Sequence, residues 1–242
     1  MNYFVYKGIR SCDMGIRIQE KNVFSAPKYE VTFQSIPGRN GDLIQPGGRL
    51  PNVQITYSVF VPAKSVDELA SKLTAIKAWL YSGLQQYHNL ADTYNSGYTR
   101  KAVFAGQLDI EDQLNKIGVF TISFSCHPYR FSTSGLETTE YASGDVVTNP
   151  YQFPSKPYMK VYGDGEGTLT IQSAADNSSW VFSDIDGYIE VDSEQMNFYK
   201  GADPQNDLVS GSGFPILYPG ENALTFTGGI TKVAIEPRWV TL

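Results

Sequence analysis

Features common in enzymes and membrane proteins are scarce in this chain of 242 residues. Only two histidines and two cysteines are present, and charged residues make up 18% of the sequence. Low charge, combined with 22 glycines and 13% aromatic residues, argues against intrinsic disorder and against a coiled coil. No apolar run approaches the roughly 20 residues needed to cross a bilayer. These absences predict a globular protein that does not insert into a membrane.

The cysteines and the first residues indicate where the protein folds. Cys12 and Cys126 lie in different strand-like segments and outside any Cys-x-x-Cys motif. We therefore expect free thiols, with no disulfide and no thiolate metal site. Residues 1–7 lack the basic and apolar regions of a secretory signal, so we expect no signal peptide and folding in a cytoplasm.

Groups suited to catalysis are equally sparse. His88 and His127 stand outside any triad or metal-ligand pattern, and no motif indicates a cofactor or metal site. Asp109, Glu111 and Asp112 would suit glycoside hydrolysis if their carboxyl groups were held ~5–9 Å apart. Three acids at a turn are more often a solvated edge. We expect no catalytic residue, and a hydrolase using these three acids is the alternative.

Charge is divided unevenly along the chain. Residues 1–131 carry 14 Lys and Arg against 10 Asp and Glu, a net charge of +4. Residues 132–242 carry 5 against 15, a net charge of −10. This division predicts two units with different neighbours. Because the basic half has no clustered Lys/Arg stripe, we expect no sequence-specific binding of nucleic acid.

Alternating apolar residues predict strands in the first half. Tyr29, Val31 and Phe33 predict one half-buried strand. Two longer alternations predict further strands: Val53, Ile55, Tyr57, Val59 and Val61, then Phe120, Ile122, Phe124 and Cys126.

Residues 65–82 predict the one helix of the chain. Ser65 is a favourable N-cap, Glu68 completes a capping box, and Gly83 suits the position after the last turn. An apolar stripe that we expect to cover the sheet consists of Val66, Leu69, Leu73, Ile76 and Leu80.

A stretch rich in Gly and Pro, residues 36–52, separates two predicted strands. Hairpin loops usually have two to five residues, so a loop of this length usually has a partner or a function. Its glycines permit sharp bends, and its polar side chains include Arg39, Asn40, Asp42 and Arg49. We interpret the stretch as an arm that reaches a neighbouring subunit, with these four residues at the interface. A surface loop without a partner is the alternative.

The second half has a different pattern. Residues 132–157 are rich in Pro, Ser and Thr and predict a connector. Residues 158–242 contain short strand candidates separated by turns with Gly and Asp, and they show no helical period. This pattern predicts a β-sandwich or jelly roll. The expected domains are therefore 1–131 and 158–242, joined by 132–157.

Short motifs follow one another in a distinctive order. They are Pro37–Asp42, Lys77–Leu80, Phe124–Tyr129, Gly163–Leu169, Ile189–Glu194, Phe214–Asn222 and Pro237–Trp239. In this order they resemble the distal tail (Dit) proteins of phages with long, non-contractile tails. The resemblance covers nearly the whole chain, although no single motif is diagnostic.

The resemblance implies a mainly β fold and a structural role in the virion. The first domain would be a tail-tube-like β-sandwich with one α-helix, and the last a galectin-like β-sandwich. Six copies would form a ring, the baseplate hub at the tail tip, assembled in the host bacterial cytoplasm. Its expected partners are the tail-tube (major tail) protein, the tail-associated protein, and receptor-binding or other baseplate proteins.

A galectin-like domain also raises an alternative function, a carbohydrate-binding module that recognises host cell-wall glycans. Such sites stack an aromatic ring on a sugar, with polar groups alongside. The candidates for contact with a glycan or a partner are Trp180, Tyr188, Tyr199 and Trp239. Both tryptophans would equally suit a core or an interface.

Overall fold

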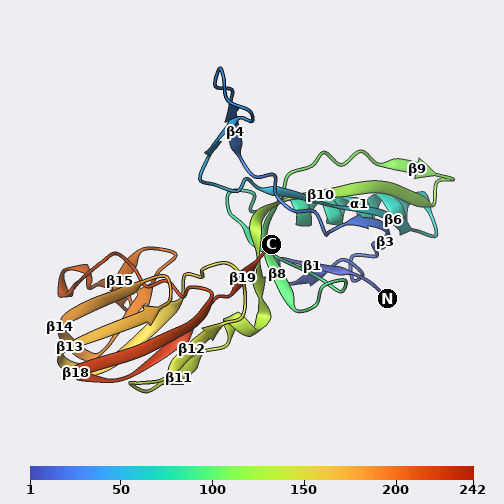
Figure 1. The fold of residues 1–242 in the computed structure, drawn as a ribbon. Coiled ribbons are helices and arrows are strands. Elements are labelled where there is room, and N and C mark those ends of the chain that lie inside the picture. Colours follow the sequence, from blue (N-terminus) through green and yellow to red (C-terminus); the bar gives the residue numbers. More distant parts are fainter. The chain divides into compact units, whose positions relative to one another are not determined.

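The computed structural model describes residues 1–242, and it divides them into two compact units. Unit 1 holds Met1–Arg130 together with Leu242, and unit 2 holds Phe131–Thr241. The chain is mainly β with one α-helix, which confirms the predicted fold class (Figure 1).

Unit 1 is built on one sheet with the strand order β2–β1–β7–β8–β10–β6–β3, and β9 lies beside β10. The bounds are β1 Phe4–Tyr6, β2 Ile9–Arg10, β3 Arg17–Asn22, β6 Val53–Pro62, β7 His88–Asp92, β8 Tyr98–Phe104, β9 Glu111–Gln113 and β10 Ile117–Ser132. The longest pairing joins β6 to β10, from Pro62 opposite Ile117 to Val53 opposite Cys126. These two strands therefore form the longest ladder of the sheet, with β8 beyond β10 and β3 beyond β6.

The core of unit 1 lies on one face of this sheet. Alternation buries every second residue of β6 and β10, namely Val53, Ile55, Tyr57, Val59, Val61, Phe120, Ile122, Phe124 and Cys126. From β1, Phe4 and Tyr6 place their rings 5.6 and 4.8 Å from the ring of Phe124. The predicted period of two is thus confirmed in both strands. Burial also raises the pKa of the Cys126 thiol to about 12, so this thiol is unreactive.

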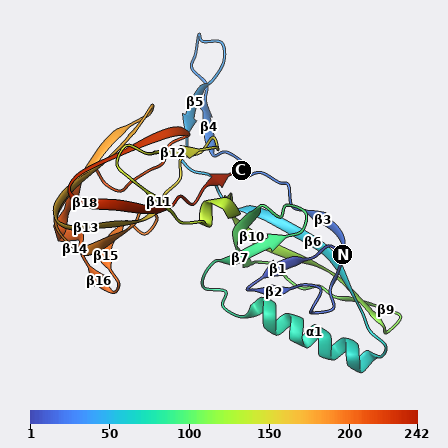
Figure 2. The same cartoon turned by 90° about the horizontal axis from the view of Figure 1, so that it is seen from below.

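Helix α1 spans Val66–Tyr81 and lies along one side of unit 1 (Figure 2). Its N-cap is Ser65, whose hydroxyl oxygen accepts a hydrogen bond from the backbone N–H of Glu68 at 3.3 Å. The Glu68 carboxylate accepts a bond from the backbone N–H of Lys64, one residue earlier than a strict capping box requires. After the last turn, Gly83 adopts the left-handed conformation with φ 61°.

The buried face of α1 follows the predicted stripe with one exception at its start. Its buried residues are Leu69, Ile76, Trp79 and Leu80. Val66 is 52% exposed, so the first residue of the predicted stripe contributes little to the core. At the other end, the Lys7 ammonium group donates to the carbonyl of Trp79 and to Ser82, which satisfies free acceptors of the last turn.

Unit 2 contains one sheet with the strand order β11–β18–β13–β14–β15–β16, in which β12 lies beside β18 and β17 beside β14. The bounds are β11 Thr139–Tyr141, β12 Val146–Asn149, β13 Tyr158–Ser173, β14 Asn177–Asp192, β15 Asn197–Lys200, β16 Asp203–Pro204, β17 Val209–Gly211 and β18 Gly220–Glu236. The short strand β19, Val240–Thr241, lies outside this sheet. The three long strands β13, β14 and β18 curl around a single core (Figure 1).

Several glycines that the sequence marks as turns are instead bends within these long strands. Gly163 of β13 lies opposite Gly187 of β14, and Gly167 lies opposite Gly228 of β18. The pairing of β13 with β18 is irregular between Gly163 and Gly167. The backbones approach so closely there that a Cβ on Gly229 would lie 1.7 Å from the carbonyl oxygen of Asp164. Glycine is therefore required where the sheet bends.

The stretch predicted as a connector, residues 132–157, belongs to the fold of unit 2. It contains β11 and β12, which both pair with β18. Val147 is buried, and the buried Asn149 amide donates to the carbonyls of Phe153 and Leu217. Pro, Ser and Thr here mark short strands and turns, so the predicted connector is wrong.

Candidate assembly surfaces

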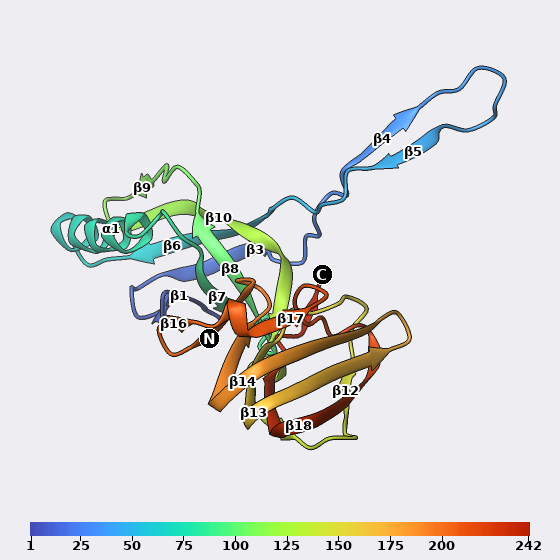
Figure 3. The same ribbon diagram turned by 90° about the vertical axis from the view of Figure 1, so that its left-hand side faces the viewer.

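The predicted arm is a hairpin that projects from the sheet of unit 1 (Figure 3). It consists of β4, Val31–Gln34, and β5, Leu43–Pro46, which pair only with each other. The arm in this article is residues 24–51. The strand predicted around Tyr29, Val31 and Phe33 is present as β4, but its predicted burial is wrong, because every residue from 32 to 49 is exposed.

Both ends of the arm are held by hydrogen bonds to unit 1. At its start, Val23 is buried and its carbonyl accepts a bond of 2.9 Å from the guanidinium of Arg100. At its end, the Asn52 amide donates to the Tyr87 hydroxyl at 2.6 Å and to the Ser125 hydroxyl at 2.9 Å. The arm is therefore a defined extension with a fixed base.

The register of the hairpin separates its side chains into two faces. Val31 lies opposite Pro46, and Phe33 lies opposite Ile44. Because directly paired residues point to the same side of an antiparallel ribbon, these four form one apolar face. The other face carries mainly polar residues: Thr32, Gln34, Gln45 and, as its one apolar member, Leu43.

The apolar face has no cover from the arm's own sheet, which consists of two strands. Phe33 is 60% exposed and Ile44 is 61% exposed. An isolated two-stranded hairpin is marginally stable in water at best. A ribbon that exposes its apolar side in this way fits a contact with another chain.

Three of the predicted interface residues lie at the tip of the arm. The backbone N–H of Arg39 donates to the carbonyl of Ile36 at 3.1 Å, which closes a turn with Pro37 and Gly38 in the middle. Gly38 has φ 81°, as the third position of a type II turn requires. Arg39, and beyond the turn Asn40 and Asp42, are exposed at the far end of the ribbon.

The fourth predicted interface residue, Arg49, has a partner within the arm. Its Nε lies 2.9 Å from a carboxylate oxygen of Glu30, and both side chains are largely exposed. Nearby, the N–H of Gly47 donates to the carbonyl of Glu30 at 2.8 Å, and a Cβ on Gly47 would approach that oxygen to 2.9 Å. Arg49 thus joins the two sides of the hairpin below the ribbon.

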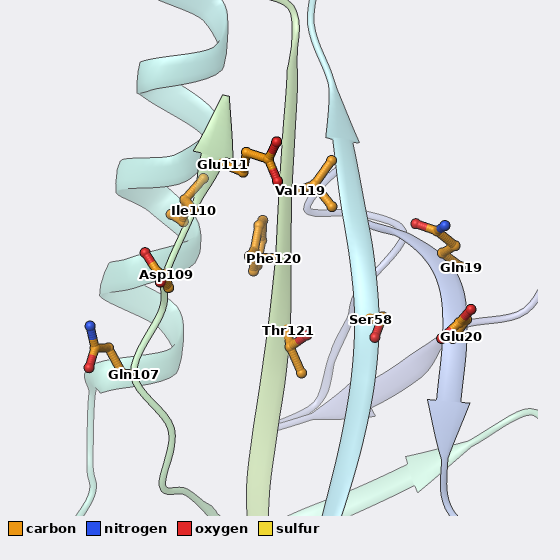
Figure 4. A pocket seen from close by; sticks show the side chains of 10 residues that line it. All are labelled: Gln19, Glu20, Ser58, Gln107, Asp109, Ile110, Glu111, Val119, Phe120 and Thr121. Carbon is orange, nitrogen blue, oxygen red and sulfur yellow. The ribbon is translucent and has the colours of Figure 1, made fainter. Parts of the chain in front are cut away.

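A groove of about 720 Å³ lies on unit 1 (Figure 4). It is bordered by β3 on one side and by the segment leading into β9 on the other, with β6 and β10 between them. Its lining residues are Gln19, Glu20, Ser58, Gln107, Asp109, Ile110, Glu111, Val119, Phe120 and Thr121. Asp109 and Glu111 from the predicted acidic cluster thus face a broad groove, together with Glu20.

The histidines occupy structural positions. The His88 Nε2 atom lies 2.7 Å from the carbonyl oxygen of Gly83, just after helix α1. Its ring meets the edge of the Tyr6 ring at a centroid distance of 5.8 Å. The His127 Nδ1 atom accepts from the backbone N–H of Tyr129.

Both tryptophans proposed for glycan contact lie in the core of unit 2. Trp180 is 2% exposed and Trp239 is 7% exposed. The indole N–H of Trp180 donates to the carbonyl of Gly213 at 2.8 Å. Neither ring therefore presents a free face for stacking on a sugar.

The two tyrosines proposed for the same contact are partly exposed on β14 and β15. The Tyr188 ring is covered by the Lys160 ammonium group, 3.5 Å from its centroid, and lies 6.2 Å from the Tyr162 ring. Tyr199 lies opposite Glu190, and burial is the main cause that raises the pKa of its hydroxyl. This surface is a network of tyrosines and lysines in which Tyr188 already has a cation on one face.

An ion pair closes the end of the same strands. The Arg238 guanidinium binds both carboxylate oxygens of Asp192, at 3.0 and 3.1 Å. Burial alone would raise the pKa of the Asp192 carboxyl. The bonds from Arg238 and from the backbone N–H groups of Glu194 and Gln195 outweigh it, so the pKa is lowered. Asp192 is thus held as a carboxylate and links the end of β14 to the C-terminal segment.

Two features of these surfaces are absent from the sequence predictions. The ribbon β4–β5 has a detectable signal, because Leu43 to Pro46 follows a Pro-Gly turn and can pair with Val31 to Gln34. The groove has no detectable signal in the sequence, since its residues come from β3, β6, β10 and a loop that are far apart in the chain.

No helix of the structure is long and apolar enough to span a bilayer.

The part of the chain that carries the arm is similar to a known protein family. Residues 14–126 match the family model described as the phage tail protein RIFT-related domain. No curated protein sequence matches the chain. Among solved structures, the Dit (gp 19.1) protein of SPP1, titled a paradigm of the hub adsorption apparatus in phages that infect Gram-positive bacteria, is similar over 100% of both chains. Its TM-score is 0.79 and its identity 16%.

A second similar structure is that of the phage p2 baseplate in its activated conformation with Sr. It covers 97% of this chain and 98% of the other, with a TM-score of 0.52 and 10% identity. At these identities the likeness shows a shared fold, and the family model adds a match in sequence. The resemblance to Dit proteins is therefore confirmed: residues 14–126 match a phage tail family model, and the whole chain shares its fold with the SPP1 Dit protein.

Proposed function

We propose that the protein is a distal tail protein of a long, non-contractile phage tail. Six copies of unit 1 form a ring, the hub that joins the tail tube to the adsorption apparatus. The observation that carries this proposal is the exposed apolar face of the arm, in a domain that matches a phage tail family. The shared fold with the SPP1 Dit protein supports the same role.

The arm suits a ring because it projects from its own sheet and can reach a different surface of the next copy. An arm that binds a different patch of the next copy makes a heterologous contact, which generates a closed ring when the rotation closes. A self-complementary contact would give a dimer instead. Arg39, Asn40 and Asp42 at the tip lie where they can bind polar groups of the neighbour.

A ring of this kind has two ends and an outer surface for other components. We assign one end to the tail-tube (major tail) protein and the other to the tail-associated protein. Unit 2 is the site for receptor-binding proteins or other baseplate proteins. Its charge of −10 over residues 132–242, against +4 for residues 1–131, supports different partners for the two units. The location is the virion tail tip, after assembly in the host cytoplasm.

The role is structural rather than catalytic. Asp109 and Glu111 face an open groove with Glu20, and Asp112 lies in β9 opposite Gly118. A glycosidase needs two carboxyl groups held on either side of the scissile bond, and a broad polar groove suits a macromolecular contact better.

Carbohydrate binding is the less favoured alternative. Trp180 and Trp239 are buried, and Lys160 lies over the ring of Tyr188. A glycan would have to displace that lysine or use Tyr199. Binding on a glycan array that is lost in Tyr188→Ala and Tyr199→Ala variants would restore this alternative.

Electron microscopy tests the proposal. Antibodies against the chain should label phage particles at the free end of the tail. Averaged images of the purified protein should show rings with sixfold symmetry. Label along the tube or on the capsid, or particles without rotational symmetry, would contradict the proposed function.

A further inference from the structure

We infer that the groove between β3 and the segment before β9 receives the arm of the next copy, with Phe33 and Ile44 inserted into it. This inference deepens the proposed ring, and it rests on that proposal. It assigns the occupant of the groove as a second copy of this chain.

The groove and the arm both present apolar side chains. Ile110 and Val119 give the groove an apolar part, and its volume of about 720 Å³ exceeds what one side chain fills. Clefts of about 300–1,000 Å³ accommodate ligands larger than a single side chain. The arm presents an apolar pair of matching character, because Phe33 and Ile44 lie opposite each other and are both exposed.

The groove and the tip of the arm also carry opposite charges. Glu20, Asp109 and Glu111 line the groove, and no Lys or Arg does. On the arm, Arg49 is paired with Glu30, whereas Arg39 stands at the tip beyond the apolar pair. With the apolar pair in the groove, Arg39 lies within reach of its acidic border. Opposite charges at the edge of such a contact chiefly select orientation and partner.

The arm is long enough to reach across a neighbouring unit. From the buried Val23 to Arg39 the chain has sixteen steps, which at about 3.3 Å each extend to ~50 Å. A unit of about 130 residues has a radius of gyration near 14 Å, hence a width of roughly 35–40 Å. The arm can therefore cross a neighbouring unit. In Figure 3 it points away from the sheet that carries its own groove, so the receiving groove belongs to another copy.

Photo-crosslinking between two differently tagged populations of the full chain tests the inference. One population carries a photoreactive phenylalanine in place of Phe33, and the other carries only an affinity tag. After mixing and irradiation, peptide mapping should place crosslinks on residues 107–111 or 119–121 of the tagged copy. The matched control places the same group at Gln45, on the opposite face of the ribbon, and should lose most of these crosslinks.

Reversing the charges of Arg39 and of two acids of the groove tests the same contact independently, through the strength of assembly. The Arg39→Glu variant should assemble at least several-fold more weakly than the wild type, and adding Asp109→Lys and Glu111→Arg should recover much of that loss. All these positions are exposed, so circular dichroism should show unchanged folding. Crosslinks between copies that map elsewhere in an intact ring would overturn the groove and leave the proposed function standing. A strictly monomeric chain without crosslinks would overturn both.

Discussion

Two antiparallel hairpins of this protein have the same alternation of apolar residues, but one hairpin buries them and the other exposes them. In β13–β14 the alternating apolar residues are buried, with Leu169 fully buried and Trp180 2% exposed. In β4–β5 the corresponding residues Phe33 and Ile44 are 60% and 61% exposed. Alternation thus dictates a ribbon with one apolar face in both cases. What covers that face depends on the rest of the fold, and for the arm we assign the cover to another copy.

The difference has a consequence for mutagenesis. Substitutions in β13–β14 should change the stability of the chain itself, because each buried side chain has partners in the same unit. Substitutions on the arm should leave stability unchanged and alter assembly. Four experiments sharpen or break this distinction.

The largest effect is expected at the bend of unit 2. In Gly229→Val the new side chain meets the carbonyl of Asp164, 1.7 Å from the Cβ position. Because backbone must move, we expect a loss above about 4 kcal/mol, measured by chemical denaturation. Gly165→Ala is the control: its φ is 74° with open space around the Cβ, so about 1 kcal/mol should be lost. Equal stability of both variants would refute a glycine-dependent bend.

A matched pair of aliphatic truncations compares the hairpins directly. Leu169→Ala in β13 should cost about 3 kcal/mol, because it opens a cavity in a fully buried site. Ile44→Ala in the arm should change unfolding by less than about 0.5 kcal/mol and still weaken assembly. Thermal unfolding of dilute protein and sedimentation of concentrated protein separate the two readouts. A destabilised, fully assembling Ile44→Ala variant would contradict the account of the arm.

The buried ion pair predicts a dependence on pH. The pKa of Asp192 is lower in the folded chain than its ordinary value near 3.8, so the unfolded chain binds this proton first. Its contribution to stability is complete above about pH 5 and declines as the pH falls through the lowered pKa. Asp192→Asn removes the carboxylate that binds Arg238 through two bonds and leaves that guanidinium paired with Glu236, so it should cost about 2 kcal/mol at pH 7. Thermal unfolding between pH 3 and 7 should also show a weaker acid dependence in this variant than in the wild type.

The smallest effect is expected for the exposed ion pair of the arm. Arg49 and Glu30 are 67% and 44% exposed, so solvent screens their attraction. Arg49→Ala should change the free energy of unfolding by less than about 0.5 kcal/mol. A loss as large as that of Asp192→Asn, measured under the same conditions, would show that the arm packs on its own chain.

The sequence predicts individual helices and strands better than it predicts which segments pack against them. Spacing is sufficient for α1 and for β6 and β10, because each buries a face whose period is set locally. The long strands of unit 2 read as pairs of short strands, since Gly163 and Gly187 suit a turn as well as a bend. Only the alignment of glycines from three strands distinguishes the two, and that alignment is a tertiary property.

The candidate sites divide in the same way. A projecting segment was predictable because an unusually long stretch rich in Gly and Pro separates two strands, and the structure places Arg39 at its tip. Trp180 and Trp239 were ambiguous because a large aromatic residue suits a core and a binding face equally. The structure places both in the core. The groove was not predictable, because pairing in the sheet brings its residues together.

The central claim is that the apolar face of the arm joins copies of this chain. Sedimentation equilibrium of the full chain and of the Phe33→Ser/Ile44→Ser variant, at the same concentrations, tests it most directly. The account predicts a mass of six chains, or a concentration-dependent approach to it, for the wild type and a folded monomer for the variant. A wild type that stays monomeric, or a variant that assembles equally well, would contradict it.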